Sequence, residues 1–134
     1  MKRYIYVLTI IFTLIASFGC GKTEKTEVSF FNVDKNTFKK DSDKPILKIT
    51  NEDDIKLFED ILNSSNKING ITNVASPNFI VEINKNSKVE EFLFIVDESS
   101  GMYSNTKDTH TWYEIDEKYL REFIDFYNDK LKNR

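Results

Sequence analysis

The chain has 134 residues, 19 basic and 22 acidic side chains, and a formal net charge of −3 at pH 7. A chain of this length holds one domain with one modest hydrophobic core. The acidic balance argues against nucleic acid as a partner, because nucleic-acid binding requires a basic face. The single cysteine excludes an intrachain disulfide, so packing alone has to stabilise the fold.

The first twenty residues have the pattern of an export signal. Lys2 and Arg3 precede a nearly unbroken apolar run over residues 4–18, which ends at Gly19 and Cys20. A helix over that run spans roughly 22 Å, which is short of the roughly 30 Å hydrocarbon core of a bilayer. The run therefore fits a cleaved signal peptide better than a permanent membrane span.

The end of this segment, residues 14–20, resembles the lipobox of bacterial lipoproteins. Gly19 and Cys20 match the lipobox pattern, whereas Ser17 stands where Leu is usual and Phe18 where a small residue is common. The resemblance implies that Cys20 carries a diacylglycerol and that signal peptidase II removes residues 1–19. The alternative is an uncleaved N-terminal anchor in which Cys20 is an ordinary thiol.

Lipidation predicts a protein anchored at the extracytoplasmic face of the cell membrane. Residues 20–27 are polar and lack apolar periodicity, so we expect a short tether there, followed by one domain over residues 28–134. Loss of Lys2 and Arg3 with the leader brings the net charge near −5. The lipid on Cys20, rather than a basic protein surface, would then hold the domain at the membrane.

The first half of the domain predicts two strands and a helix. A strand begins at Val28, a charged loop follows over residues 32–44, and residues 46–49 form a second strand. The lysines and aspartates of the loop alternate, which favours a solvated loop over a basic ligand site. Thr50 or Asn51 caps a helix whose acidic first turn, residues 52–54, compensates the helix dipole rather than binding a metal. A loop is expected at residues 70–77.

The second half predicts a four-stranded meander and a final helix. Strands are expected at residues 78–84, 89–97, 102–105 and 109–115, and the strand at 89–97 is apolar on both faces, so we expect it at the centre of the sheet. Asp116 caps the last helix. The buried stripe expected for this helix is Leu120, Phe123, Ile124, Tyr127 and Leu131.

This order, β-β-α-β-β-β-β-α, predicts an α+β fold. We expect an antiparallel sheet of five to six strands with both helices packed on one face.

Three short motifs carry a resemblance to a known family: Pro77-Asn78-Phe79, Gly101-Met102 and Asp108-Thr109-His110-Thr111-Trp112-Tyr113. With these motifs, the region from Ile46 to Leu131 resembles the YhfM-like domain of membrane-anchored bacterial proteins and lipoproteins. The resemblance implies an extracytoplasmic, membrane-tethered domain. It brings no established activity, so no catalytic residue is carried over.

The sequence offers little for catalysis or for a cofactor. It contains no phosphate loop, no Cys-x-x-Cys pair and no Gly-x-Ser-x-Gly elbow, so we expect no cofactor and no assigned catalytic residue. A divalent-ion site of Asp97, Asp108 and His110 requires the sheet register to bring the three together. The alternative is a histidine in a turn whose neighbours bond the local backbone.

Aromatic side chains near the last two strands are the remaining candidates for recognition. Tyr103, Trp112, Tyr113 and His110 are the possible interaction residues, since aromatic side chains are favoured at interaction hot spots. Period 2 puts Trp112 and Tyr113 on opposite faces, which makes Trp112 either a contact residue on the open face or a buried one.

We therefore expect a non-enzymatic binding or interaction module with an unidentified envelope partner. The alternatives are a small hydrolase or metal-dependent enzyme that acts on envelope material, and an immunity or inhibitor protein with an acidic surface.

Overall fold

The computed structural model describes residues 25–69 and 75–132. The predicted leader, the lipidation residue Cys20, most of the tether and residues 70–74 of the predicted loop lie outside the described residues.

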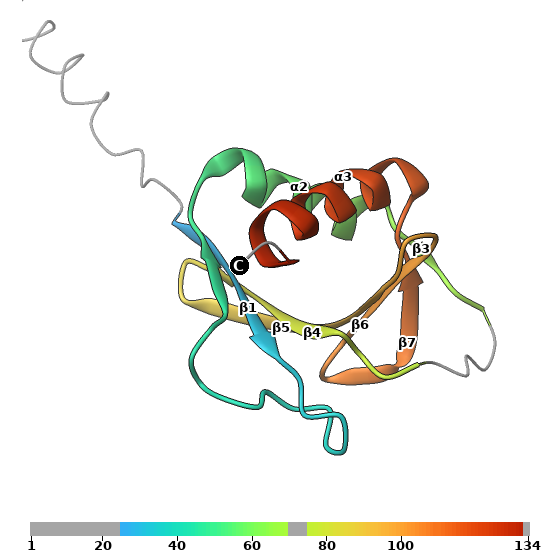
Figure 1. Ribbon diagram of the computed structural model, residues 1–134, viewed down its shortest axis with the longest axis horizontal. Helices are drawn as coiled ribbons and strands as arrows, with labels where there is room; N and C mark the ends of the chain where they lie inside the picture. Colours follow the sequence, from blue (N-terminus) through green and yellow to red (C-terminus); the bar gives the residue numbers. More distant parts are fainter. Residues whose placement is uncertain (1–24, 70–74, 133–134) are drawn as a thin grey trace, which may run out of the picture.

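The described chain forms one antiparallel sheet with two helices over one face (Figure 1). The strands lie in the order β2-β1-β4-β5-β6-β7-β3. The elements are β1 (Thr26–Asn32), β2 (Leu47–Ile49), α2 (Glu52–Ser64), β3 (Asn66–Lys67), β4 (Phe79–Lys85), β5 (Lys88–Val96), β6 (Gly101–Asn105), β7 (Asp108–Glu114), α3 (Glu117–Tyr127) and a terminal π-helix η1 (Asn128–Lys132). The predicted α+β fold is confirmed, with a seven-stranded sheet where five to six strands were expected.

Two strand boundaries differ from the expectation. β1 begins at Thr26, so two residues assigned to the tether pair with β4 instead, Thr26 with Lys85 and Glu27 with Asn84. The added strand, β3, consists of two exposed polar residues that pair with the end of β7. Neither segment has the apolar alternation by which a strand is recognised in a sequence, because neither buries a face by itself.

Both helices begin at predicted caps. The Asn51 side-chain oxygen accepts a hydrogen bond of 2.8 Å from the backbone N–H of Asp54, and that of Asp116 accepts one of 2.9 Å from Lys118. These bonds satisfy backbone donors that have no partner inside the helix. The acidic first turn of α2 fits the positive end of the helix dipole.

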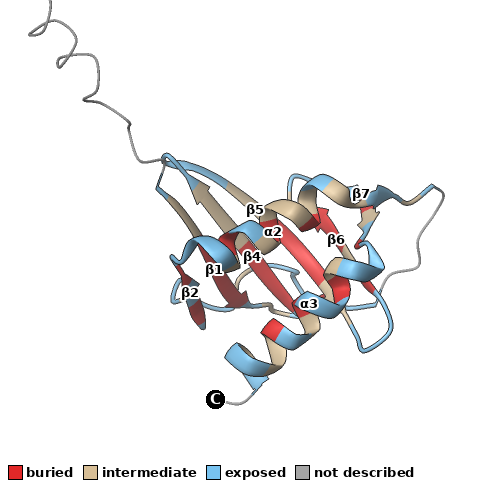
Figure 2. Cartoon of the chain, turned by 90° about the horizontal axis from the view of Figure 1, so that it is seen from above, coloured by how far each residue is buried: buried red, intermediate tan, exposed pale blue. Residues whose placement is uncertain are grey.

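Aromatic rings fill the core between the helices and the sheet. Phe30, Phe58, Phe94 and Phe123 are among the largest fully buried side chains, and Figure 2 shows buried residues on the strands that lie under the helices. The rings of Phe30 and Phe58 meet edge to face with centroids 5.4 Å apart, while Phe94 and Phe123 stack at 5.9 Å. Each such pair contributes about 0.5–1.5 kcal/mol beyond its buried area.

One member of this core, Phe126, is missing from the predicted stripe of the last helix. Its ring lies 5.9 Å from that of Phe30 and 5.6 Å from that of Phe58. Phe126 lies at the edge of the stripe centred on Phe123, and only the helix's path across β1 brings the core to that edge. The rest of the stripe is confirmed: Leu120 and Phe123 are buried, and Ile124, Tyr127 and Leu131 are partly buried against the core.

The opposite face of the sheet carries a second, smaller core. Phe31, Ile80, Leu93 and Trp112 are buried there. β5 contributes to both cores, because Phe92 and Phe94 face the helices while Leu93 faces away. The prediction of a central strand buried on both faces is therefore confirmed.

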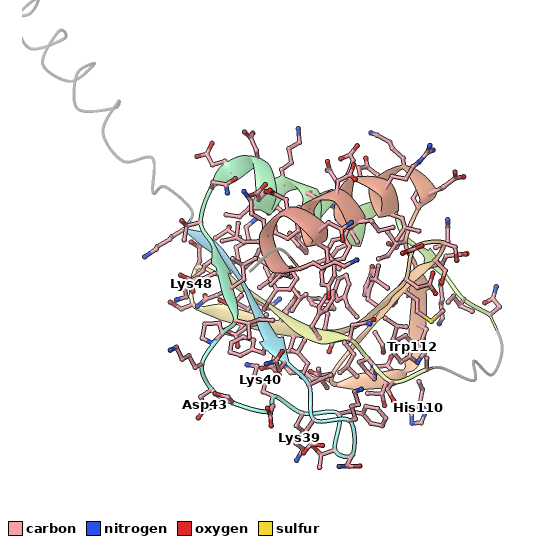
Figure 3. All side chains as sticks on the ribbon, viewed as in Figure 1. Lys39, Lys40, Asp43, Lys48, His110 and Trp112 are labelled. Atoms are coloured by element: carbon pink, nitrogen blue, oxygen red, sulfur yellow. The ribbon has the colours of Figure 1, made fainter. Side chains whose placement is uncertain are left out.

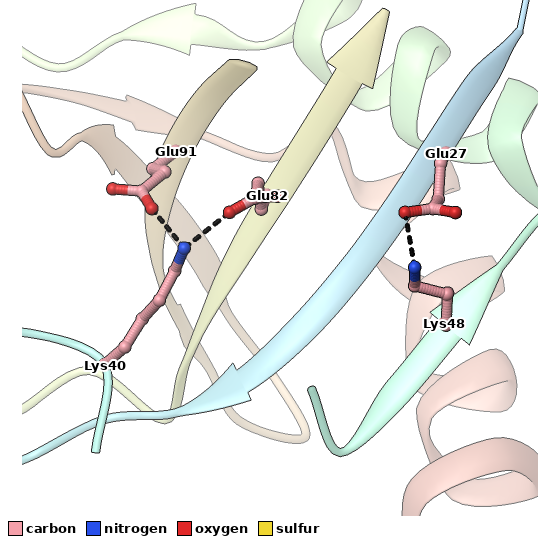
Figure 4. A network of polar contacts seen from close by, with 5 residues as sticks. All are labelled: Glu27, Lys40, Lys48, Glu82 and Glu91. Carbon is pink, nitrogen blue, oxygen red and sulfur yellow. Dashed lines mark hydrogen bonds and ion pairs between the residues drawn. The ribbon is translucent and has the colours of Figure 1, made fainter. Parts of the chain in front are cut away.

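The loop between β1 and β2 lies on this second side. Figure 3 shows Lys39, Lys40 and Asp43 on the side of the sheet opposite the helices. Most of the loop is exposed, as predicted, but Lys40 is partly buried. Its ammonium pairs with Glu82 and Glu91 (Figure 4) and lies 4.2 Å from the ring centre of Phe31.

The strand register places the two acidic side chains opposite each other, so the positive charge of Lys40 reduces their mutual repulsion. Glu82 on β4 is directly opposite Glu91 on β5, and like charges at opposed positions destabilise a sheet. Burial by itself lowers the pKa of Lys40, but the hydrogen bonds and charges of Glu82 and Glu91 outweigh it and raise that pKa above its ordinary value. Lys40 thus offsets one of the two negative charges and attaches the loop to the sheet.

Replacing Lys40 by Met should destabilise the domain. The variant leaves Glu82 and Glu91 opposed without a counter-ion, and we expect a loss of about 1–2 kcal/mol in the free energy of unfolding, measured by urea denaturation. Adding Glu91→Gln should restore part of the loss. The matched control Lys39→Met, at an exposed neighbour, should change stability by less than about 0.5 kcal/mol. Equal effects at both lysines would contradict the assignment.

Candidate functional site

Two of the predicted interaction residues, Tyr103 and Tyr113, belong to the core under the helices. Tyr103 is 4 % exposed, and its hydroxyl donates to the carbonyl of Leu62 at 3.3 Å. Its burial raises the pKa of the phenol. Tyr113 is partly buried and stacks on Tyr103 with ring centroids 5.3 Å apart. Both rings therefore have a structural role in the described chain, and their contact with a partner stays a prediction.

Trp112 lies on the face away from the helices, as period 2 requires, and of the two alternatives it takes the buried one. The side chain is 7 % exposed, and its indole N–H donates to the carbonyl of Thr109 at 3.0 Å. The ring belongs to the second core, together with Phe31, Ile80 and Leu93, and closes it from the β7 side.

His110 is exposed because β7 carries a bulge. Ser104 pairs with Trp112 while the next residue, Asn105, pairs with Asp108, so residues 109–111 have no partner on β6. The buried Ser104 hydroxyl lies 2.9 Å from the carbonyl oxygen of Asp108 and 2.8 Å from that of Thr111. Bulges of this kind redirect side chains, and here the redirected side chain is His110, labelled in Figure 3.

The divalent-ion alternative does not match the topology. Asp97 follows β5 and Asp108 begins β7, so the two lie at opposite ends of β6. The sheet register does not bring Asp97 to His110, because successive turns of a meander lie at opposite ends of the strands. Within residues 25–69 and 75–132, no group of three or more histidine, cysteine or acidic side chains is arranged to hold a metal ion.

Both acids are used by local turns instead. Asp97 accepts hydrogen bonds from the backbone N–H and the hydroxyl of Ser99 and of Ser100. These bonds lower the pKa of Asp97 to about 2. For Asp108, a hydrogen bond from the Thr111 side chain is the main cause of a lowered pKa.

The turn at Asp97 forms one wall of a cleft that the sequence did not reveal. The cleft has a volume of about 180 Å³ and lies where the start of β4 and the end of β5 meet the C-terminal end of α3 and η1. Its apolar walls are Phe79, Val96, Ile124 and the ring of Tyr127. Its polar rim is Asp97, Glu98, Asn128 and Lys132.

The π-helix helps to build this rim. Ile124 near the end of α3 and Asn128 and Lys132 in η1 follow one another at intervals of four residues. All three line the cleft.

Several polar groups on the rim have no partner within the described chain. The side chains of Glu98, Asn128 and Lys132 and the hydroxyl of Tyr127 make no hydrogen bond or ion pair with any residue of 25–69 or 75–132. A concave apolar surface with a few convergent polar groups is typical of a small-molecule site. We therefore take this cleft as the candidate functional site.

Two larger depressions at the other end of the sheet have a different character. They measure about 600 and 340 Å³ and share Glu59 and Lys85 in their walls. Charges in these walls already pair, Lys85 with Glu59 at 3.4 Å and Lys88 with Glu90 at 2.8 Å. These depressions therefore present fewer unpaired charged groups to a ligand than the cleft at Glu98 does.

The cleft was missed because its walls come from distant parts of the sequence. Phe79 and Tyr127 face one another, with ring centroids 5.7 Å apart, although 47 residues separate them along the chain. Tyr127 was recognised only as part of a buried stripe. A π turn at the end of a helix leaves no signal in residue type that would have indicated the rim.

Comparison with known proteins supports the fold. The chain is similar to the crystal structure of a thioesterase-like protein from Clostridium sporogenes ATCC 15579, with a TM-score of 0.56 and 16% identity over 78% of this chain and 95% of that chain. At this identity the likeness shows the fold alone.

The chain also matches a family model, and its described helices are too short or too polar to span a membrane. No curated protein matches the chain. The family model described as YhfM protein matches residues 29–133. In the part of the chain that the structure describes, no helix has the length and apolarity needed to cross a membrane.

Replacing Asp97 by Asn should change how stability depends on acid. Since the folded-state pKa of Asp97 is lowered to about 2, its contribution is present above the unfolded pKa near 4 and is lost as pH falls through 2. The melting temperature of the parent should therefore exceed that of Asp97→Asn at pH 7, and the difference should shrink between pH 4 and pH 2. A difference that stays constant over this range would contradict the role of Asp97.

Proposed function

The chain belongs to the YhfM protein family, and we propose that it is a lipid-anchored module that binds a small ligand at the outer face of the cell membrane. The observation that carries the binding function is the cleft between β4, β5 and the end of α3, with its apolar walls and uncommitted polar rim. The anchor rests on the sequence of residues 1–20. Together they describe a receptor for a ligand outside the cytoplasm.

The direction of β1 indicates where the cleft would lie relative to a lipid on Cys20. β1 begins at Thr26, six residues after Cys20, and ends at Asn32, which pairs with Phe79 of the cleft. A strand of this length spans roughly 20 Å. A lipid on Cys20 would therefore leave the cleft at the end of the sheet remote from the anchor, where a ligand from outside can reach it.

The residues of the cleft favour binding over hydrolysis. A small hydrolase is the rival function, and the similar solved protein is described as thioesterase-like. None of the eight residues that line the cleft is a serine, cysteine or histidine, so the lining holds no Ser–His or Cys–His pair of nucleophile and base. An immunity or inhibitor function rests only on the negative charge of the chain.

The anchor can be tested by the mass of the protein extracted from membranes. We expect a chain that begins at Cys20 and carries a diacylglycerol. Cys20→Ala, which offers no thiol for the lipid, should keep its leader and show an unmodified mass. A parent protein with an intact Met1 or an unacylated Cys20 would contradict the lipoprotein assignment and leave the cleft untouched.

The cleft can be tested by filling it. Asn128→Trp should place an indole in the cleft without disturbing the core, because Asn128 is only partly buried. We expect this variant to lose the chemical-shift changes that small aromatic compounds cause at Val96 and Ile124 of the full chain in micelles. The matched control is Asp125→Trp, at an exposed position of α3. No shift changes in the parent, or identical changes in both variants, would remove the cleft as a binding site.

A further inference from the structure

We propose that the ligand of this cleft is a zwitterion of amino-acid size with an apolar or aromatic side chain. Glu98 would bind its ammonium group and Lys132 its carboxylate, while Phe79 and Tyr127 hold the side chain. The proposal rests on the binding function proposed above and adds the chemical class of the ligand.

The size of the cleft limits the ligand. Sites for drug-sized molecules measure about 300–1,000 Å³, whereas this cleft measures about 180 Å³. The cleft is thus smaller than a typical site for a drug-sized molecule, which favours a ligand of the size of a free amino acid over a larger one.

The walls define the apolar part of the ligand. The rings of Phe79 and Tyr127 stack at 5.7 Å with an interplanar angle of 21°, and Val96 and Ile124 complete the apolar lining. A planar or branched side chain gains buried apolar area against such walls at about 25 cal/mol per Å². An aromatic ring adds a ring contact with the exposed part of Tyr127.

The rim defines the charged part. Glu98 belongs to the turn after β5, and Lys132 ends η1, so the two charges reach the cleft from separate elements. No hydrogen bond or ion pair joins them, or ties either to another described side chain. Asp97 already accepts four hydrogen bonds from Ser99 and Ser100, which leaves Glu98 as the cleft carboxylate without a partner in the described chain.

Two uncommitted charges of opposite sign favour a ligand that carries both signs. A purely cationic ligand would pair with Glu98 and meet repulsion from Lys132, and a purely anionic ligand would do the reverse. A zwitterion pairs with both at once, and Asn128 offers an amide that can donate or accept a further hydrogen bond. The same chemistry occurs in a free amino acid and in a short peptide, and only the size of the cleft favours the former.

Calorimetry with charge-matched probes tests the class. The full chain in detergent micelles is titrated with L-phenylalanine, L-phenylalaninamide, N-acetyl-L-phenylalanine, 2-phenylethanol and the dipeptide Phe-Phe. We expect L-phenylalanine to bind at least tenfold more tightly than the amide or the N-acetyl compound, each of which lacks one charge. Stronger binding of Phe-Phe would identify a peptide as the source of the zwitterion.

Variants assign the two charges. Glu98→Gln should weaken the binding of L-phenylalanine about tenfold and should strengthen that of the anionic N-acetyl-L-phenylalanine, because a repulsive charge is removed. Lys132→Met should weaken L-phenylalanine similarly and should strengthen the cationic amide. The double exchange Glu98→Lys with Lys132→Glu should restore part of the affinity, because the ligand can bind in the reverse orientation. The matched controls, Glu122→Gln and Lys56→Met, alter exposed charges on the helices away from the cleft.

The outcomes separate the two proposals. Equal affinities for L-phenylalanine, its singly charged derivatives and the neutral 2-phenylethanol, all abolished by Asn128→Trp, would overturn the zwitterion and retain a binding cleft. No binding of any probe would overturn the ligand class and the binding function together.

Discussion

The burial of β5 on both faces is the constraint on which the rest of the structure depends. Phe92 and Phe94 require a cover on one side and Leu93 requires one on the other. The part of the chain that the structure describes has two α-helices, α2 and α3, and both lie on the Phe94 side of the sheet. The Leu93 side must therefore be closed by single side chains, of which the indole of Trp112 is one. The loop between β1 and β2 is attached on the same side through the ion pairs of Lys40.

The position of the cleft follows from the same packing. To cover β1 and β4, α3 has to cross the sheet until Phe126 reaches Phe30 and Tyr127 reaches Phe79. The C-terminal end of α3 then lies near the end of β5, and residues of the Asp97 turn and of α3 line the cleft together. The apolar walls of the cleft are thus the border of the core. Its charges come from two chain segments at this border, the turn after β5 and η1.

The sequence predicted those features that depend on local physics. Alternation gave β4, β5 and their faces, and the capping side chains Asn51 and Asp116 gave the helix starts. Features that depend on pairing between distant segments were missed: the two-residue strand β3, the bulge that exposes His110, and the cleft. The metal hypothesis failed for the same reason, since the position of Asp97 relative to His110 depends on which end of the sheet each turn occupies.

The two ends of β1 lie toward the proposed anchor and toward the cleft. The segment before Thr26 leads toward Cys20, and the other end of the strand pairs through Asn32 with Phe79, a wall of the cleft. The strand lies between β2 and β4 within the sheet, and its central residues are buried. Under the proposed lipidation of Cys20, the attachment and the cleft would therefore lie at opposite ends of a strand that is paired on both sides and belongs to the core.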